Sequence, residues 1–156
     1  FRHGPGIVHM LGLDSVFRMY EMQRYVRNEA HLLTGFVRFA RLPEGILAGR
    51  IGPKNDVLPL VAEHFEDRLS GENWMLWDEL RDKAAVHRAD RDTVMVRGIP
   101  DSVRRWVKDA GRQDPFGELW KAFVETISIE ERENRKCQRT HLPLRYREYM
   151  TEWERD

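Results

Sequence analysis

The run NWMLWDE at residues 73–79 constrains the fold of this sequence more than any other feature. It holds four apolar residues in succession, from Trp74 to Trp77. A short run of this composition predicts a strand, and one apolar enough to lie in the centre of a sheet. The sequence therefore predicts a sheet with this segment inside it.

Four other short runs predict the remaining strands. The first two are joined by a turn with Pro43 and Gly45, and the last two by a turn at residues 89–91. A helix capped by Asn55 or Asp56 separates the second strand from NWMLWDE. The four runs are residues 35–40, 45–51, 82–88 and 92–99.

Helices are predicted on both sides of this β-β-α-β-β-β unit, which covers residues 34–98. Asp14 or Ser15 caps a helix to about Leu33, because its apolar residues recur at spacings of three and four. Three helical patterns follow residue 98. The first runs from Asp101 to Gly111, and the other two start at Asp114 and Pro143. We expect an α+β fold: an antiparallel sheet of about five short strands, packed with an N-terminal helix and a helical C-terminal third.

The composition fits one soluble globular domain. The chain has 156 residues, of which 41% are hydrophobic and 33% charged. We expect an irregular start at 1–13, the helix and sheet unit at 14–98, and the helical part at 99–156. The single cysteine favours a reducing, cytoplasmic location. Because the chain begins with Phe1 and not with Met, it is expected to be a fragment or a trimmed chain.

The charge balance excludes a global field that would draw the chain onto nucleic acid. Net charge is +0, from 26 basic and 26 acidic residues. Arginine, however, outnumbers lysine by 21 to 5. Arginine binds phosphate in a bidentate fork and stacks on bases, although a GC-rich genome would give the same bias.

Sequence motifs for common chemistries are absent. Gly49, Gly52 and Lys54 do not form a phosphate-binding loop, and there is no Gly-x-Ser-x-Gly elbow. Cys137 and His141 have a metal-like spacing, but two ligands do not make a zinc site. We therefore predict no metal and no cofactor.

Several groups of polar residues are candidates for binding phosphate. The first helix carries Tyr20, Arg24, Arg27 and His31 on one face, which suits a phosphate backbone or is an ordinary solvated face. The turn GPKND at residues 52–56 offers backbone donors and Lys54 to an anion, unless Asn55 or Asp56 occupies those donors as a helix cap.

Two further groups have the same ambiguity. His64 and Arg68 are one turn apart beside an apolar stripe, so they contact a phosphate or pack as structural residues. The basic and aromatic run that includes Arg132, Asn134, Arg145 and Tyr146 suits backbone contact and base stacking, while nearby glutamates can pair with its arginines.

Acidic residues give no clear catalytic pair. Asp78 follows the most apolar strand. Burial there would raise the pKa of its carboxyl group, and the simpler alternative is a salt bridge between Asp78 and Arg81. Glu29 and His31 are two apart on a helix and do not face each other. The junction EAHLLTGFVRF at residues 29–39 is therefore expected to present His31 and Arg38 to a phosphate.

Five segments together resemble an uncharacterised bacterial family assigned to DNA metabolism. Family members are encoded beside a DNA-repair radical-SAM protein, and a similar domain is fused to uracil-DNA-glycosylase-like domains. The resemblance therefore implies DNA as a partner and a role in repair or modification. Because family members are often longer at the N-terminus, it also implies that this chain is the later part of a longer protein. Its matching positions include His31, Arg38, His64, Arg68, Arg81, Arg132, Asn134, Arg145 and Tyr146. The segments are residues 29–39, 56–69, 73–88, 119–138 and 142–152.

Three functions remain open from the sequence. The first is a nucleic-acid-associated accessory or binding domain in DNA repair or modification. The second is an enzyme that acts on nucleic acid or a nucleotide, using His31 or His64 with a nearby carboxylate. The third is a protein-interaction module for a partner repair enzyme, for which an exposed patch of Trp74, Trp77 or Trp106 would be the sign.

Overall fold

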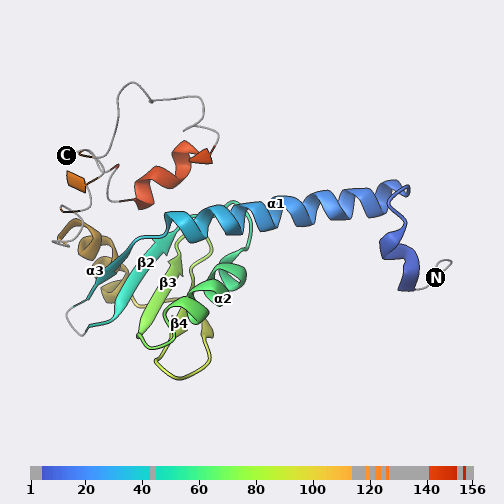
Figure 1. Ribbon diagram of the computed structural model, residues 1–156. Helices are drawn as coiled ribbons and strands as arrows, with labels where there is room; N and C mark the ends of the chain where they lie inside the picture. Colours follow the sequence, from blue (N-terminus) through green and yellow to red (C-terminus); the bar gives the residue numbers. More distant parts are fainter. Residues whose placement is uncertain are drawn as a thin grey trace.

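The computed structural model describes residues 5–42, 45–113, 119, 122–123, 126, 141–150 and 153. Along this part of the chain, groups of two and three strands are separated and flanked by helices (Figure 1). In chain order, the elements are the 3-10 helix η1 (Pro5–His9), α1 (Asp14–Phe36), β1 (Phe39–Arg41), β2 (Leu47–Ile51), α2 (Leu58–Arg68), β3 (Trp74–Asp78), β4 (Lys83–His87), β5 (Val94–Arg97), α3 (Asp101–Gln113) and the 3-10 helix η3 (Leu144–Tyr149).

The five strands form one mixed sheet in the order β1-β2-β3-β4-β5. Three neighbouring pairs are antiparallel, but β2 and β3 run parallel. The predicted α+β class and the five short strands are confirmed, whereas the prediction of a purely antiparallel sheet is wrong. The reason is the connection between the two strands: α2 crosses over the sheet and returns the chain to the end where β2 began, so β3 runs the same way.

Strand β3 is the centre of the molecule, as its composition predicts. All five of its residues are buried. Trp74 and Leu76 pack in a core with residues of α1 and α2, while Met75 and Trp77 pack in a second core with Val107 of α3. Alternate residues of a strand point to opposite faces of a sheet, so α1 and α2 lie over one face and α3 over the other.

Helix α1 is longer than its apolar pattern predicts. It continues through Gly35 to Phe36, and the Val37 N–H still donates to the Leu33 carbonyl at 2.9 Å. Its N-terminal half extends beyond the sheet (Figure 1). There the Tyr20 hydroxyl donates to the Val8 carbonyl at 2.9 Å, which holds η1 against the helix. An ordered 3-10 turn thus occupies part of the predicted irregular start.

The C-terminal part differs from the predicted run of helices. Helix α3 ends at Gln113 rather than Gly111, and most of the predicted helix from Asp114 to Cys137 lies outside the described residues. Residues 144–149 form a 3-10 helix, which lies against α1 (Figure 1). Nowhere in the described part of the chain is a helix both long and apolar enough to span a membrane.

Candidate functional site

The most unusual side chain in the core is the carboxylate of Glu29 in α1, which is only 6% exposed. Its Oε1 accepts a hydrogen bond from the Lys54 N–H at 2.7 Å. Its Oε2 accepts from the Asn55 N–H at 2.8 Å and from Asn55 Nδ2 at 2.6 Å. The hydroxyl of Tyr146 in η3 donates to Oε1 as well. Each carboxylate oxygen therefore accepts two hydrogen bonds, and Glu29 joins α1 to the loop of residues 54–55 and to η3.

These donors decide the ionisation of the site. Burial by itself raises the pKa of Glu29, but the hydrogen bonds from Tyr146, Lys54 and Asn55 outweigh it and hold that pKa below its usual range. Burial, together with the hydrogen bond to Glu29, raises the pKa of Tyr146 to about 12. At neutral pH Glu29 is therefore ionised and Tyr146 protonated. Since the lone pairs of Glu29 are occupied, it serves as an anchor and not as a general base.

The GPKND turn binds an anion, and that anion is the chain's own Glu29. The backbone donors of Lys54 and Asn55 are the ones that the sequence offered to a phosphate. The predicted cap on α2 is not formed, because the N-cap residue is Val57 and has no side-chain hydrogen bond. Asn55 instead binds Glu29, and Asp56 forms an ion pair with Lys83.

A cavity of about 520 Å³ lies beside this network, a size within the range of small-molecule sites. Helix α1 contributes apolar and polar side chains to its lining, among them Met22 and Tyr25, which are each 62% exposed. The rest of the lining comes from residues 54–55 and η3. The lining residues are Met22, Tyr25, Val26, Asn28, Glu29, Leu32, Lys54, Asn55, Arg145 and Tyr146. We call this the Glu29 cavity.

Arg145 supplies an accessible positive charge at the Glu29 cavity. Its guanidinium lies 4.6 Å from the centre of the Tyr146 ring and donates to the Tyr146 hydroxyl at 2.9 Å. It is 3.8 Å from the Glu29 carboxylate, and half of its side chain remains exposed. The family-matching pair Arg145 and Tyr146 is therefore brought together at one site, with a buried hydroxyl and an exposed cation.

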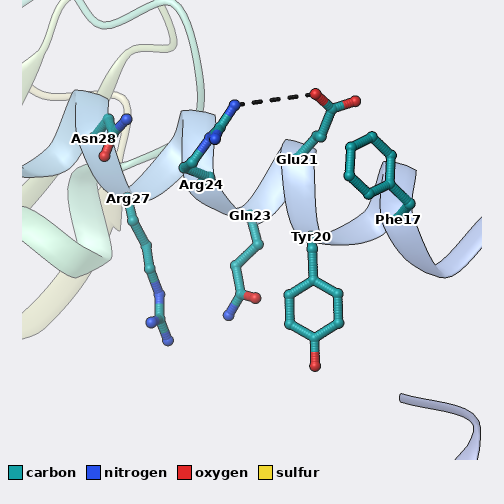
Figure 2. A pocket seen from close by; sticks show the side chains of 7 residues that line it. All are labelled: Phe17, Tyr20, Glu21, Gln23, Arg24, Arg27 and Asn28. Atoms are coloured by element: carbon teal, nitrogen blue, oxygen red, sulfur yellow. Dashed lines mark ion pairs between the residues drawn. The ribbon is translucent and has the colours of Figure 1, made fainter. Parts of the chain in front are cut away.

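A second cavity, of about 450 Å³, lies along the N-terminal half of α1. In Figure 2, Tyr20, Gln23 and Arg27 point to one side of the helix, and Arg24 points to the other, toward Glu21 at 4.0 Å. Asn28 lines this α1 cavity and the Glu29 cavity, so the two adjoin. The full lining is Phe17, Tyr20, Glu21, Gln23, Arg24, Arg27 and Asn28.

Other predicted contact residues lie apart from these cavities. His31 is exposed on α1 but does not line either cavity. His64 and Arg68 are exposed on α2, where the His64 ring packs edge-on against Phe65 with 5.1 Å between centres. Arg38 donates to the Gly35 carbonyl at the end of α1, at 3.0 Å. Arg132 and Asn134 lie outside the described residues.

Arg81 has an internal role. Its guanidinium donates to the carbonyls of Pro53 at 2.9 Å and Lys54 at 2.6 Å, and to Asp78 at 3.1 Å. Asp78 is fully buried, and burial raises its pKa although the contacts with Arg81 oppose that rise. Both expectations for Asp78 therefore hold. The hydrogen bonds from Arg81 to the Pro53 and Lys54 carbonyls fix the loop whose N–H groups bind Glu29.

The importance of Glu29 is missed when only its immediate neighbours in sequence are considered. A signal was nevertheless present. Glu29 follows Val26 by three residues and precedes Leu33 by four, so it falls on the apolar side of α1. A carboxylate there must find buried donors. The donors themselves, 25 and 117 residues away, cannot be read from this pattern.

The far face of the sheet carries a different kind of cavity. It measures about 520 Å³ and is mainly apolar, with Trp106 of α3 on its rim. Trp74 and Trp77 are buried, whereas Trp106 is 51% exposed. Apolar side chains that line this Trp106 cavity are Leu42, Ile46, Met75, Val86 and Val103.

Comparison with known proteins gives one match. No curated protein and no solved structure matches this chain. The family model of a domain of unknown function, DUF4130, matches residues 1–152. This match spans α1, the whole sheet and η3, and so includes every element that builds the Glu29 cavity. The chain belongs to the DUF4130 family.

Proposed function

We propose that this domain binds nucleic acid along α1 and the Glu29 cavity, as an accessory module in DNA repair or modification. One observation supports this most directly: the two adjoining cavities of α1 gather basic and aromatic side chains on a chain that has no net charge. The basic residues are Arg24, Arg27, Lys54 and Arg145, and the exposed aromatic residues are Phe17, Tyr20 and Tyr25.

The charges at this surface favour a polyanion. Arg24 makes a long 4.0 Å contact with Glu21, and its guanidinium lies 5.9 Å from the centre of the Tyr25 ring. Because the Arg24 side chain is 66% exposed, the ion pair is weak. The Glu29 carboxylate, 3.8 Å away, offsets part of the charge of Arg145, but half of the Arg145 side chain stays exposed and can reach a phosphate. Arginine and lysine side chains in this state can each contact a phosphate oxygen.

The biological context comes from the family resemblance. It implies a DNA-repair radical-SAM protein or a uracil-DNA-glycosylase-like domain as the partner. A binding module fits that context because it would hold the strand while the partner performs the reaction.

The enzymatic alternative has weaker support. It requires His31 or His64 to meet a carboxylate in a cleft. Neither histidine lines the three cavities described above. The buried carboxylate nearest to a cavity, Glu29, has both oxygens occupied.

The test is salt-dependent DNA binding, measured by fluorescence anisotropy with the full chain. Arg24→Ala and Arg145→Ala should each weaken binding and lower the slope of log K against log salt concentration by about one. Arg105→Ala is the matched control, since Arg105 is an exposed arginine of α3 over the opposite face of the sheet. Affinity that ignores salt, or that falls equally in the control, would refute the proposal.

Exposed Trp106 favours a second candidate function, the docking of a partner repair enzyme on the apolar cavity beside it. A large exposed aromatic residue next to an apolar cavity is typical of protein interfaces. Adding a radical-SAM repair protein or a glycosylase-like domain should change Trp106 fluorescence, and Trp106→Ser should weaken the complex. If the wild type and Trp106→Ser bound the partner with equal affinity, the Trp106 cavity would be excluded as the docking surface.

A further inference from the structure

The Glu29 cavity has side chains suited to a nucleobase. A base presents two flat aromatic faces and an edge of donors and acceptors. Tyr25 offers a phenol ring of which 62% is exposed at the cavity, and Met22 lies on the same wall with equal exposure. Exposed aromatic rings of this kind are the usual stacking partners of unpaired bases in single-strand binding proteins.

Two side-chain amides lie at the same cavity. Within the described part of the chain, the Asn28 amide forms no hydrogen bond, and its position between the two cavities keeps it accessible. Asn55 is fixed differently, since its Nδ2 donates to Glu29 at 2.6 Å, while its side-chain carbonyl accepts no hydrogen bond from the described residues. An amide can give a base both a donor and an acceptor, as asparagine does with adenine.

The Glu29 network holds this cavity in a fixed shape. The carboxylate ties the Asn55 backbone and side chain to α1 and ties Tyr146 to the same point. Tyr146 in turn positions the Arg145 guanidinium over its ring. Lys54 and Arg145 line the same cavity as Tyr25, and their charges suit the phosphate of a stacked nucleotide.

From this arrangement we propose that the Glu29 cavity accepts one unpaired base of a bound strand. Tyr25 lies against the face of the base, Asn28 and Asn55 contact its edge, and Arg145 and Lys54 contact its phosphate. The inference rests on the proposed nucleic-acid binding and narrows it to single strands or displaced bases. In a duplex, the faces and the pairing edge of each base are already occupied, so a paired base does not satisfy these groups.

The experiment compares three ligands of equal phosphate number by fluorescence anisotropy: a single strand, the same strand with abasic sites, and a duplex of half its length. The full chain should bind the single strand about tenfold more tightly than the other two. Tyr25→Ala should remove that preference and leave the affinity for the abasic strand unchanged. Tyr25→Phe, which keeps the ring, should behave as the wild type, and Arg24→Ala should weaken all three ligands alike.

The outcomes separate this inference from the proposed function. Equal affinity for all three ligands, unchanged by Tyr25→Ala, would overturn the base inference while DNA binding stands. Absence of binding to any ligand would overturn both. A free mononucleotide that binds as tightly as the strand would show a nucleotide site and would also overturn the inference of a strand-bound base. Because Tyr25 is mostly exposed, its replacement should not disturb the fold.

Discussion

The hydroxyl of Tyr146 donates a hydrogen bond to the buried carboxylate of Glu29, 117 residues earlier in the chain. This bond joins η3 to α1 at the point where the loop of residues 52–56 also meets the helix. The candidate site is thus built around one compensated charge. The first four predictions concern the charges that hold this site together, and the last concerns the docking of η3 on β2.

Glu29→Gln should strongly destabilise the fold. The substituted amide keeps one acceptor oxygen and turns an NH2 group toward donors that then have no acceptor. We expect a loss of about 2–4 kcal/mol in the free energy of unfolding, measured by urea denaturation. Glu21→Gln is the matched control on the same helix, and should cost under about 0.5 kcal/mol because Glu21 is exposed. Similar small losses in both variants would show that the buried network contributes little.

Stability should depend on pH through Glu29. Because its pKa is lower in the folded chain, the unfolded chain binds a proton there more readily. The stabilisation from Glu29 is complete above the ordinary glutamate pKa of about 4.3 and is lost as the pH falls through the lower, folded value. Unfolding free energies measured from about pH 7 to pH 3 should show this loss in the wild type and a flatter acid limb in Glu29→Gln. An unchanged acid limb in the variant would contradict the assignment.

Asp78 should change stability with pH in the opposite direction to Glu29. Its pKa is raised in the folded chain, so the stability that it contributes falls as the pH rises from about 3.9 through the higher folded value. Asp78→Asn should remove this component, and the acid limb attributed to Glu29 should then become steeper. The measurement is the same series of urea titrations, and identical slopes in the variant and the wild type would argue against a buried, ionising Asp78.

Arg81→Ala should cost about 3 kcal/mol of stability, because it leaves the Asp78 carboxylate buried without its charged partner. The double variant with Asp78→Asn should lose less than the sum of the two single losses, which a double-mutant cycle measures. Lys83→Ala provides a control pair, since its partner Asp56 is 47% exposed and the expected cost is under about 1 kcal/mol. Strict additivity for Asp78 and Arg81 would mean that the two do not act as a unit.

Gly52→Ala should displace η3. A Cβ at residue 52 would lie 2.0 Å from the Tyr149 hydroxyl oxygen and 2.6 Å from the ring carbon that bears it. That hydroxyl also donates to Glu79 at 2.8 Å, so it cannot move freely. We expect a loss of about 1–3 kcal/mol by thermal or urea unfolding.

Gly35→Ala is the control for that substitution, because nothing lies within 4 Å of its added Cβ and the residue is helical. It should stabilise by about 0.5–1 kcal/mol. If Gly52→Ala proved as harmless as Gly35→Ala, the tight packing of Tyr149 on β2 would be disproved.

The sequence predicts local structure well where a pattern is complete within a segment. NWMLWDE is the central strand, and the α1 and α2 patterns end within a few residues of the observed helices. The direction of β3 was missed because apolar periodicity is the same in parallel and antiparallel strands. The decisive clue was instead the helix between β2 and β3, since a crossover of that kind makes neighbouring strands parallel.

The site was only partly predictable, for a related reason. Four residues predicted to contact phosphate, Arg24 and Arg27 of α1 with Arg145 and Tyr146 of η3, line the two adjoining cavities. Arg81 instead donates to internal acceptors, and its partners belong to a loop 27 or 28 residues earlier. Side-chain type indicates which groups can bind an anion, but only long-range packing decides whether that anion is external or a carboxylate of the same chain.

The hydrogen bond between Tyr146 and Glu29 also sets the order in which the parts of the site form during synthesis. The ribosome completes α1 well before it reaches η3, and 117 residues at about 5–20 residues per second amount to roughly 6–23 s. Throughout that interval, the Glu29 carboxylate of the nascent chain lacks its hydroxyl donor, and the Glu29 cavity lacks the part of its lining that Arg145 supplies. The Glu29 cavity is therefore completed last, when the strands of the sheet have already been synthesised.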